Sequence, residues 1–393
     1  MIDADGEART LFPTDSSQFA MMKGFPCFLA FFLLAGCGHG SEPRVEVVLT
    51  GLENPRGVVV MSTGEIMVAE AGTGYDAADP TQMTGKLTMF SDRNGDGDFS
   101  DEGESERWFS HMPTYNALQF FVTGRDEVNG PGDLLLHPDG RFFLSVDGGL
   151  DQIALYEISP EGRIGRNLAD RSNMNGIAFS PDYAHIYLAE STANRLSEVS
   201  LEGDYRAIVD FPPLAHEQQA VPAGVAVDPR TGEVLVALFS GAAVDPQSGD
   251  TIPFIPGDAR VVRVNPADGR FFNEILGLTT AVDVAVDENS NVYVVEMSSD
   301  YADLLPQRFD LFDADAEPLH GGYLRFTGRV TLYPADGRAP RVLAEGLDMP
   351  TNITVGPDGA LYVSTGEGTP GRPIPGPEGP TTIVGQVIRI QSE

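Results

Sequence analysis

Short runs of alternating apolar and polar residues recur along this chain, and pairs of runs are joined by turns rich in Pro, Asp and Gly. The clearest copy is Ala223–Ala237 (AGVAVDPRTGEVLVA), in which small and apolar residues alternate, a turn follows and a second β-branched run returns. A period of two residues with such a turn predicts a β-hairpin. Because one such hairpin cannot bury its own apolar faces, recurrence predicts a repeat protein. Five further copies begin near Gly57, Asp133, Gly176, Asp283 and Asn352.

Most hairpins are followed by a third apolar run, and all but the last repeat continue into a fourth. Four antiparallel strands per repeat, here called A to D in chain order, together with almost no helical periodicity, predict an all-β fold, a six-bladed β-propeller. The chain ends on a third run, Gln386–Gln391, whereas Val45–Leu52 resembles a fourth run. We therefore expect the N-terminal strand to complete the last blade and close the ring, which leaves no open sheet edge.

The residues before the repeats have the features of a targeting segment. After Met22 and Lys23, an apolar run extends from Phe25 and ends in Leu34-Ala-Gly-Cys37. The run is too short to span a bilayer but suits a signal peptide. Its end resembles the bacterial lipobox, which implies lipid modification of Cys37.

This pattern predicts four segments along the chain. They are a non-native extension (1–20), which is acidic where a signal peptide should be basic, a lipoprotein signal peptide (21–36), a lipid-anchored tether (37–43) and the propeller (44–393). We expect an extracytoplasmic bacterial lipoprotein, in the periplasm or at the cell surface, that touches the membrane only through its lipid anchor.

Composition narrows the possible partners. The net charge is −33, from 58 acidic and 25 basic residues, and no basic cluster is present, which argues against nucleic acid as a partner. Both cysteines precede residue 40, so the propeller has no disulfide, thiolate metal site or cysteine nucleophile. We expect a monomer.

Nearly all long insertions are expected on one face of the ring. If every A strand runs from the first face to the second, the B–C loops and D–A links lie on the first face. Long loops that cluster around a propeller channel are typical of a binding site. The insertions are the B–C loops 72–85, 240–258, 298–328 and 366–385 and the D–A links 111–131 and 211–222.

The same geometry predicts which side chains line the channel mouth. Residues at the starts of A strands and at the ends of B strands meet beside the axis on that face. Such a ring can hold a cation, hydrogen-bond a sugar or pair with itself around channel water. The candidates are Arg56, Asp133, Asn175, Asp283 and Asn352 from the A strands and Glu70, Glu190 and Glu296 from the B strands.

One acidic insertion lies on the opposite face, between strands C and D of the first repeat. Oxygen-bearing side chains at its positions 1, 3 and 5, followed by Gly97, have the spacing of a calcium loop. Position 12 is Gly103 rather than Glu, and no helices flank the loop. We expect a structural Ca²⁺ ion rather than a solvated turn. The candidate ligands are Asp92, Asn94, Asp96, Asp98, Asp101, Glu102 and Glu104.

With the repeats assigned, the chain resembles the ScyD/ScyE family of secreted six-bladed propellers. The resemblance rests on Leu52–Gly57 with Val68–Gly74, on Ala220–Val227 with Ala259–Val264, and on Pro350–Val363. It covers most of residues 45–391 and implies the architecture, but it implies no catalytic residue because no reaction is defined for the family.

Two enzyme families with this fold provide the alternatives. Asn175-Gly176 resembles the motif that supplies a divalent-metal ligand in gluconolactonase and regucalcin-like hydrolases, although their Asp ligand in the next blade falls on Ala223. Pro55–Gly57 resembles quinoprotein sugar dehydrogenases, which need a His base. The candidates for that base are His111, His216 and His320.

We therefore expect a calcium-stabilised propeller that binds a small molecule, a glycan or a protein partner on its long-loop face. A metal-dependent lactonase is the alternative, and a quinoprotein dehydrogenase is the third possibility. Fold alone does not decide among the three.

Overall fold

The computed structural model divides the chain into two units, Met1–Ser41 and Glu42–Glu393, and all described residues belong to the second. They are 43–74, 82–99, 101–116, 126–148, 152–171, 173–241, 243–244, 251–252, 255–299 and 323–391. The predicted extension, signal peptide and lipidation site at Cys37 lie outside the described residues, as does His320. No helix in the described ranges has the length and apolar character needed to cross a bilayer.

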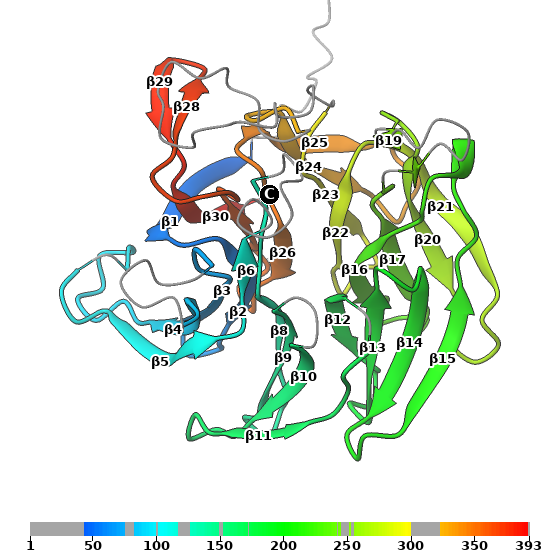
Figure 1. Ribbon diagram of the computed structural model, residues 1–393, viewed down its shortest axis with the longest axis horizontal. Helices are drawn as coiled ribbons and strands as arrows, with labels where there is room; N and C mark the ends of the chain where they lie inside the picture. Colours follow the sequence, from blue (N-terminus) through cyan, green and yellow to red (C-terminus); the bar gives the residue numbers. More distant parts are fainter. Residues whose placement is uncertain are drawn as a thin grey trace, which may run out of the picture. The chain divides into compact units, whose positions relative to one another are not determined.

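The second unit is a six-bladed β-propeller, as the repeat pattern predicted. Six four-stranded antiparallel sheets surround a central axis (Figure 1). Strands are given from the axis outward. The first blade consists of β2 (Pro55–Val60), β3 (Ile66–Glu70), β4 (Gly85–Phe90) and β5 (Ser105–Met112), and the second of β8 (Pro131–Leu136), β9 (Phe142–Asp147), β10 (Ile153–Ile158) and β11 (Ile164–Asn167). The third blade consists of β12 (Met174–Phe179), β13 (His185–Glu190), β14 (Arg195–Ser200) and β15 (Tyr205–Asp210).

The last three blades continue the same order around the ring. The fourth blade consists of β16 (Pro222–Val227), β17 (Val234–Leu238), β20 (Ala259–Val264) and β21 (Phe271–Leu278), and the fifth of β22 (Ala281–Val286), β23 (Val292–Glu296), β24 (Gly328–Tyr333) and β25 (Arg341–Leu347). The sixth blade consists of β26 (Asn352–Val355), β27 (Leu361–Thr365), β30 (Gly385–Gln391) and β1 (Arg44–Leu52).

Small elements extend from the insertions. They are the hairpins β6 (Tyr115–Asn116) with β7 (Val128–Asn129), β18 (Ala243–Val244) with β19 (Thr251–Ile252), and β28 (Pro373–Gly376) with β29 (Gly379–Thr382), and the 3-10 helix η1 (Ala215–Glu217).

The first strand of the unit closes the ring, as expected from the sequence. β1 pairs antiparallel with β30, from Arg44 opposite Gln391 to Leu52 opposite Gly385. Sequence-distant ends therefore share one sheet, and the outer edge of β30 is covered. Val48 and Leu49 of β1 are buried in the core that the last blade shares with the first.

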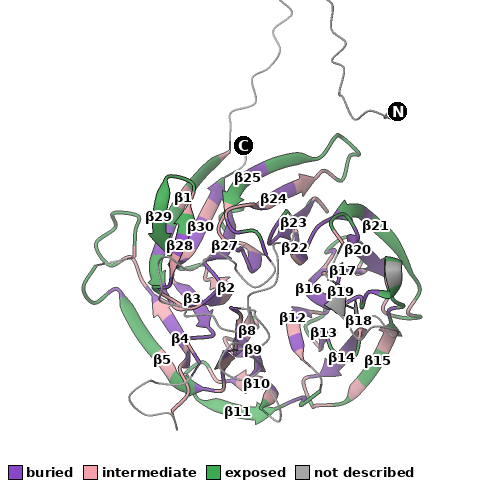
Figure 2. Cartoon of the chain, turned by 45° about the horizontal axis from the view of Figure 1, so that its top comes forward, coloured by how far each residue is buried: buried purple, intermediate pink, exposed green. Residues whose placement is uncertain are grey.

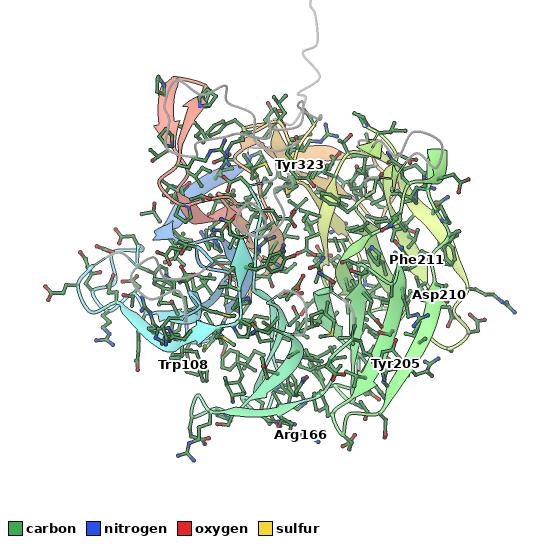
Figure 3. All side chains as sticks on the ribbon, viewed as in Figure 1. Trp108, Arg166, Tyr205, Asp210, Phe211 and Tyr323 are labelled. Atoms are coloured by element: carbon green, nitrogen blue, oxygen red, sulfur yellow. The ribbon has the colours of Figure 1, made fainter. Side chains whose placement is uncertain are left out.

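The apolar core lies between neighbouring blades. Figure 2 shows buried residues concentrated in the inner strands and exposed residues along outer strands such as β11. Between the third and fourth blades, Leu196 and Val236 are fully buried in one cluster. Aromatic edges extend the contact outward, as where Trp108 of β5 meets Phe142 of β9 with ring centroids 5.4 Å apart (Figure 3). Each blade thus covers the face that its neighbour cannot bury alone.

Glycine near the start of the innermost strands permits close approach at the axis. A Cβ atom on Gly57 would lie 2.5 Å from the backbone nitrogen of Leu134, and one on Gly176 would lie 2.5 Å from the carbonyl oxygen of Ala223. Both contacts are shorter than real Cβ atoms make. The small residues at these positions therefore follow from the convergence of six strands.

Closure by β1 is expected to stabilise the whole propeller. Leu49→Ala removes a side chain that is 3% exposed, so we expect a loss of about 2–5 kcal/mol in the free energy of unfolding. Val47→Ala on the same strand removes a side chain that is 51% exposed and should change stability by less than about 0.5 kcal/mol. Urea denaturation measures both. Equal effects of the two variants would show that β1 does not contribute a buried face.

Candidate functional site

A cavity of about 360 Å³ lies at the axis, where all six innermost strands begin. Each of these strands supplies lining residues, and the insertions on the same face supply many of the others. A concave site with a few convergent polar groups in an otherwise closed propeller is the expected place for a small ligand. From the insertions, the lining includes Asp126, Glu127, Asn129, Gln219, Val221, Ser240, Gly241, Tyr323 and Glu367.

Five of the eight residues expected at the channel mouth line this cavity. They are the residues at the starts of A strands, Arg56, Asp133, Asn175, Asp283 and Asn352. The alternation along each hairpin was sufficient to place them, because the innermost strand of every blade begins beside the axis.

The three glutamates at the ends of B strands are corrections to the sequence-based expectation. Their carboxylates are buried inside their own blades and are absent from the cavity lining. Glu70 accepts from Thr88 Oγ1 (2.8 Å), Glu190 from Ser197 Oγ and Tyr205, and Glu296 from Arg329. The partners of these three glutamates stand on strands C and D of the same blades, further from the axis than the B strands.

An amide joins two carboxylates at the axis. Asn352 Nδ2 donates to Asp133 Oδ1 (3.1 Å) and to Asp283 Oδ2 (2.9 Å). Each Asp also accepts a backbone N–H from the next blade, Asp133 from Ile177 (2.9 Å) and Asp283 from Ile353 (2.8 Å). These bonds clasp neighbouring blades.

Burial affects the charge of this pair. It raises the pKa of Asp133 to about 6, and burial together with the nearby Asp133 carboxylate raises the pKa of Asp283 well above its usual value. Asn352 Oδ1 is buried and has no hydrogen-bond partner, although buried polar atoms are rarely left unpaired. Burial therefore favours the uncharged forms of these two carboxyl groups, and the axis also holds one amide oxygen without a hydrogen-bond partner.

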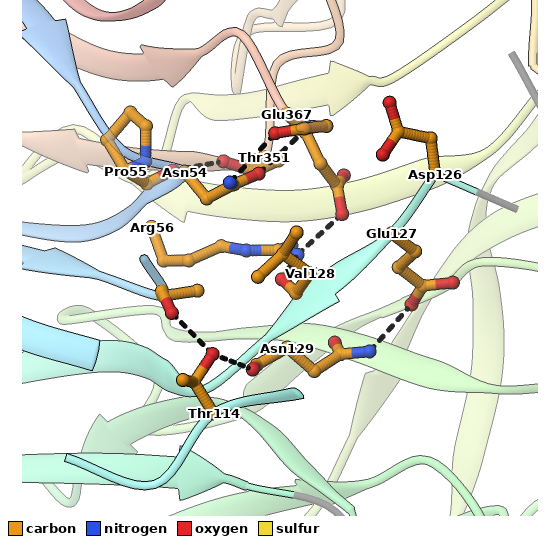
Figure 4. A network of polar contacts seen from close by, with 12 residues as sticks. Asn54, Pro55, Arg56, Thr114, Asp126, Glu127, Val128, Asn129, Thr351 and Glu367 are labelled. Carbon is orange, nitrogen blue, oxygen red and sulfur yellow. Dashed lines mark hydrogen bonds and ion pairs between the residues drawn. The ribbon is translucent and has the colours of Figure 1, made fainter. Parts of the chain in front are cut away.

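A second polar pair lies at the wall of the cavity. Arg56 donates from one terminal nitrogen to Glu367 Oε1 (2.5 Å) and to the Val128 carbonyl oxygen (2.9 Å) (Figure 4). Burial raises the pKa of Glu367 to about 7; Arg56 opposes that rise and Glu127 adds to it. A buried carboxyl group that titrates near neutrality beside a cation is a candidate acid or base.

Glu367 was not among the residues expected at the channel mouth. Those residues stand at the starts of A strands and at the ends of three B strands, whereas Glu367 stands two residues beyond the end of β27. Its burial depends on contacts from other blades, so only its place in an insertion on the cavity face could have suggested it.

Long-range bonds hold the segment 366–372 against the cavity. Asp126 and Arg372 form an ion pair at 2.7 Å, with their side chains 0% and 1% exposed. Asn54 exchanges hydrogen bonds with the backbone of Gly368, and Arg325 donates to the Glu367 carbonyl oxygen (2.9 Å). The insertion that carries Glu367 is therefore fixed by residues from other parts of the ring.

Apolar side chains form another part of the cavity wall. Met297, Tyr323 and Met349 are buried in one cluster, and Phe239 packs against it. All four line the cavity, and the rings of Phe239 and Tyr323 meet edge to face with centroids 6.0 Å apart. A ligand in the cavity would contact an acidic wall and an apolar, sulfur-rich wall.

The acidic loop between β4 and β5 brings three of its candidate ligands together and uses others to hold its own backbone. Carboxylate oxygens of Asp96, Asp98 and Asp101 lie within 4.8 Å of one another. Glu104 is instead buried, and its carboxylate accepts the backbone N–H groups of Arg93 (2.9 Å) and Asp101 (3.0 Å). The negative charge of Glu104 is the largest cause of a raised Asp101 pKa.

Other candidate ligands of the loop hold its backbone. Asp92 accepts the backbone N–H groups of Gly95 (2.6 Å) and Gly97 (3.0 Å). Asn94 donates to Asp96 (3.0 Å) and Asp101 (2.6 Å). Glu102 is exposed.

The candidate histidine bases show no link to the cavity in the described part of the chain. His111 is exposed and contacts the Met83 carbonyl oxygen through Nδ1 (3.2 Å). It is not a lining residue. His216 belongs to η1, and its side chain lies outside the description.

The chain matches the model of a known protein family. The model of the SMP-30/Gluconolactonase/LRE-like region matches residues 52–275, which span the first four blades. No curated protein sequence matches the chain.

Solved structures agree in fold. An iodide structure and a calcium structure of the Trichoderma reesei Carbohydrate-Active Enzymes Family AA12 each share 10% identity with the chain, with TM-scores of 0.54 and 0.52. Both alignments cover 90% of this chain, and they cover 97% and 96% of theirs. A putative gluconolactonase shares 13% identity over 91% of this chain and 93% of its own, with a TM-score of 0.49. At such identities the likeness shows the fold alone.

The metal implied by the gluconolactonase-like motif does not fit the residues at those positions. Asn175 Nδ2 donates to Ser191 Oγ (2.6 Å), and Ala223, which lines the cavity in the next blade, offers no side-chain oxygen. Among the described residues, three His, Cys, Asp or Glu side chains come together only at Asp96, Asp98 and Asp101.

The buried ion pair between Asp126 and Arg372 is expected to hold the segment 366–372 in place at the cavity wall. Asp126→Ala leaves a guanidinium buried without its carboxylate, so we expect a loss of about 3–5 kcal/mol. Asp336→Ala breaks an exposed pair with Arg338, whose side chain is 78% exposed, and should cost less than about 1 kcal/mol. Chemical denaturation compares the two, and a small effect of Asp126→Ala would show that the segment 366–372 is held by other contacts.

Proposed function

The chain belongs to the SMP-30/gluconolactonase/LRE-like family, and from this premise we propose that its central cavity hydrolyses a small cyclic ester. The observation that carries the proposal is the contact between Glu367 and Arg56 in a cavity with an apolar wall. Ester hydrolysis needs a base that accepts a proton from water and a positive group that stabilises the oxyanion. These two residues supply both at one place.

Glu367 has the properties that a general base requires. Its pKa of about 7 leaves a large ionised fraction at neutral pH while keeping the carboxylate basic enough to accept a proton. Oε1 accepts from Arg56, and within the described part of the chain no partner is recorded for Oε2. That oxygen is available to a water molecule.

The reaction balances with water as the only co-reactant. Glu367 accepts a proton as the water oxygen bonds to the ester carbonyl carbon, and the guanidinium of Arg56 stabilises the resulting oxyanion. The ring carbon–oxygen bond then breaks, and Glu367 returns the proton to the leaving alkoxide. The product is a hydroxy acid, whose negative charge the acidic wall disfavours.

A purely binding function for a small molecule, glycan or protein partner is the second candidate. The cavity and its two walls are compatible with it, but it gives no account of a buried carboxyl group that titrates near neutrality. We also retain membership of the ScyD/ScyE group and lipid anchoring at Cys37 outside the cytoplasm as proposals, which rest on the sequence motifs alone.

Replacing the base is expected to abolish hydrolysis. With an aromatic δ-lactone such as dihydrocoumarin, Glu367→Gln should lower kcat/KM by about 10²–10⁴-fold, whereas Glu106→Gln on the exposed face of β5 should leave it unchanged. A pH-stat assay measures both. Full activity in Glu367→Gln would contradict the assignment, and inactivity of the wild-type chain towards aliphatic, aromatic and sugar lactones would favour the binding function.

The pH profile tests the environment of Glu367. Because the carboxylate is the active form, kcat/KM should rise as pH increases through about 7 and level off above it. Glu127 raises this pKa, while Arg56 and Arg325 lower it. Glu127→Gln should therefore move the rise to lower pH without abolishing activity. A profile that does not move would show that Glu367 is not the titrating base.

We further propose that the loop 92–104 binds a structural calcium ion. Like charges already raise the pKa of Asp101, and carboxylate oxygens of Asp96, Asp98 and Asp101 lie within 4.8 Å of one another. A hard cation would relieve that repulsion. The loop follows the end of β4 opposite to the β3–β4 connection, so the ion lies away from the cavity.

Calcium should raise the stability of the wild-type chain more than that of Asp96→Ala. For a dissociation constant of about 10⁻⁴ M, 10 mM Ca²⁺ (about 100-fold higher) stabilises the folded state by about 2.7 kcal/mol. Thermal denaturation with and without Ca²⁺ measures the increment, and Glu106→Gln serves as the charge-matched control. An equal Ca²⁺-induced increase in the stability of Asp96→Ala would show that the ion does not bind in this loop.

A further inference from the structure

We propose that Arg325 is a positioning residue for the hydrolysis, one that holds the Glu367 carboxylate at the cavity wall through the backbone and through its charge. The inference rests on the proposed function, because it concerns how the proposed base is kept in place. Arg325 stands between β23 and β24 of the fifth blade, whereas Glu367 follows β27 of the sixth. Arg325 does not line the cavity, so it acts through Glu367 and not on the substrate.

The first argument is the geometry of the guanidinium. Arg325 donates from Nε to Asp348 Oδ1 (2.7 Å) and from one terminal nitrogen to Asp348 Oδ2 (2.5 Å). The other terminal nitrogen donates to the Glu367 carbonyl oxygen (2.9 Å). All three nitrogens of this planar group therefore have acceptors, and its orientation is fixed in a way that a lysine ammonium could not reproduce.

The second argument is that the same ion pair holds the backbone on both sides of one peptide unit. The Asp348 carbonyl oxygen accepts the backbone N–H of Gly366 (2.7 Å), while Arg325 holds the carbonyl oxygen of Glu367. The two side chains of the pair are 5% and 16% exposed. A Cβ atom on Gly368 would lie 3.1 Å from a terminal nitrogen of Arg325, so the guanidinium packs closely against this segment.

A movement of this guanidinium would therefore move the backbone from which the Glu367 side chain extends. Such a movement matters because a displacement of about 1 Å in a reacting group can lower a rate about 10²-fold.

The third argument is charge. Burial raises the pKa of Glu367 to about 7, Arg56 and Arg325 oppose that rise, and Glu127 adds to it. Arg325 thus favours the ionised form that a general base requires. The charged groups packed around this part of the wall are Arg56, Asp126, Glu127, Arg325, Asp348 and Arg372.

The test compares Arg325→Gln with Asp348→Asn, which break the same ion pair from opposite sides. Arg325→Gln removes a positive charge, so the Glu367 pKa should rise, and the increase in kcat/KM should move about one unit to higher pH. Asp348→Asn removes a negative charge and keeps the guanidinium, so the increase should move to lower pH. In both variants kcat at its plateau should fall about tenfold or more, while KM changes less than about threefold.

Two further variants separate charge from geometry. Arg325→Lys keeps the positive charge but not the planar fork, so the pH of the increase should stay at the wild-type value while kcat recovers only in part. Arg338→Gln is the charge-matched control, because the Arg338 side chain is 78% exposed in the same blade. It should leave both kcat and the pH profile unchanged. Shifts of the same sign in Arg325→Gln and Asp348→Asn would indicate a purely structural pair and overturn the inference.

A measurement without substrate separates this inference from the proposed hydrolysis. Carbon-13 NMR of the chain labelled at the glutamate δ-carboxyl carbon follows the Glu367 titration, whose signal is assigned by its loss in Glu367→Gln. Opposite shifts of that titration in Arg325→Gln and Asp348→Asn, in a wild-type chain that hydrolyses no lactone, would support the hold of Arg325 on the carboxylate and refute only the hydrolysis. An unchanged titration in Arg325→Gln, with near-ultraviolet circular dichroism showing the chain folded, would overturn the inference.

Discussion

The convergence of six strands on one axis is the constraint from which the rest of the structure follows. Strands that begin so close together leave no space for side chains at some positions. Two such positions, residues 57 and 176, are therefore glycine. At neighbouring positions, short polar side chains clasp one blade to the next. Asp133 accepts the backbone N–H of Ile177, and Ser145 donates to the carbonyl oxygen of Asn175. The centre of the ring is therefore polar, while the apolar core lies between blades.

This arrangement concentrates negative charge where solvent is scarce. The carboxylates that clasp the blades at the axis are buried, and burial raises the pKa of Asp133 to about 6. Buried carboxyl groups that link the blades are well suited to act as ligands or proton carriers, because bulk water no longer stabilises their charged forms. A variant that removes one of these carboxylates therefore alters both the packing of the blades and the charge at the axis.

The insertions add what the blades cannot supply. The innermost strands present mostly short polar side chains and glycines to the cavity, with Arg56 and Met174 as longer ones, whereas the segment 366–372 adds the carboxyl group of Glu367. That segment has no core of its own and depends on buried charges such as the Arg372–Asp126 pair. Tyr323, which also lines the cavity, comes from another insertion. The insertions therefore add side chains that the blades lack, and the scaffold sets where the insertions meet.

Local pattern was enough to predict the architecture. Alternation with a period of two residues, turns of Pro, Asp and Gly, and the resemblance of Val45–Leu52 to a fourth strand predicted six blades and ring closure, because each depends on neighbouring residues or on a repeat. The same logic placed Asp133, Asp283 and Asn352 at the axis, since every innermost strand begins there.

Side-chain direction and partnership were decided only by the tertiary structure. Glu70 points into its own blade because it stands on the second strand. Glu367 enters the cavity because residues of other blades hold its loop. The Asn352 amide bridges two carboxylates far away in sequence. These features depend on distances across the ring, and such distances do not exist until all six blades have closed.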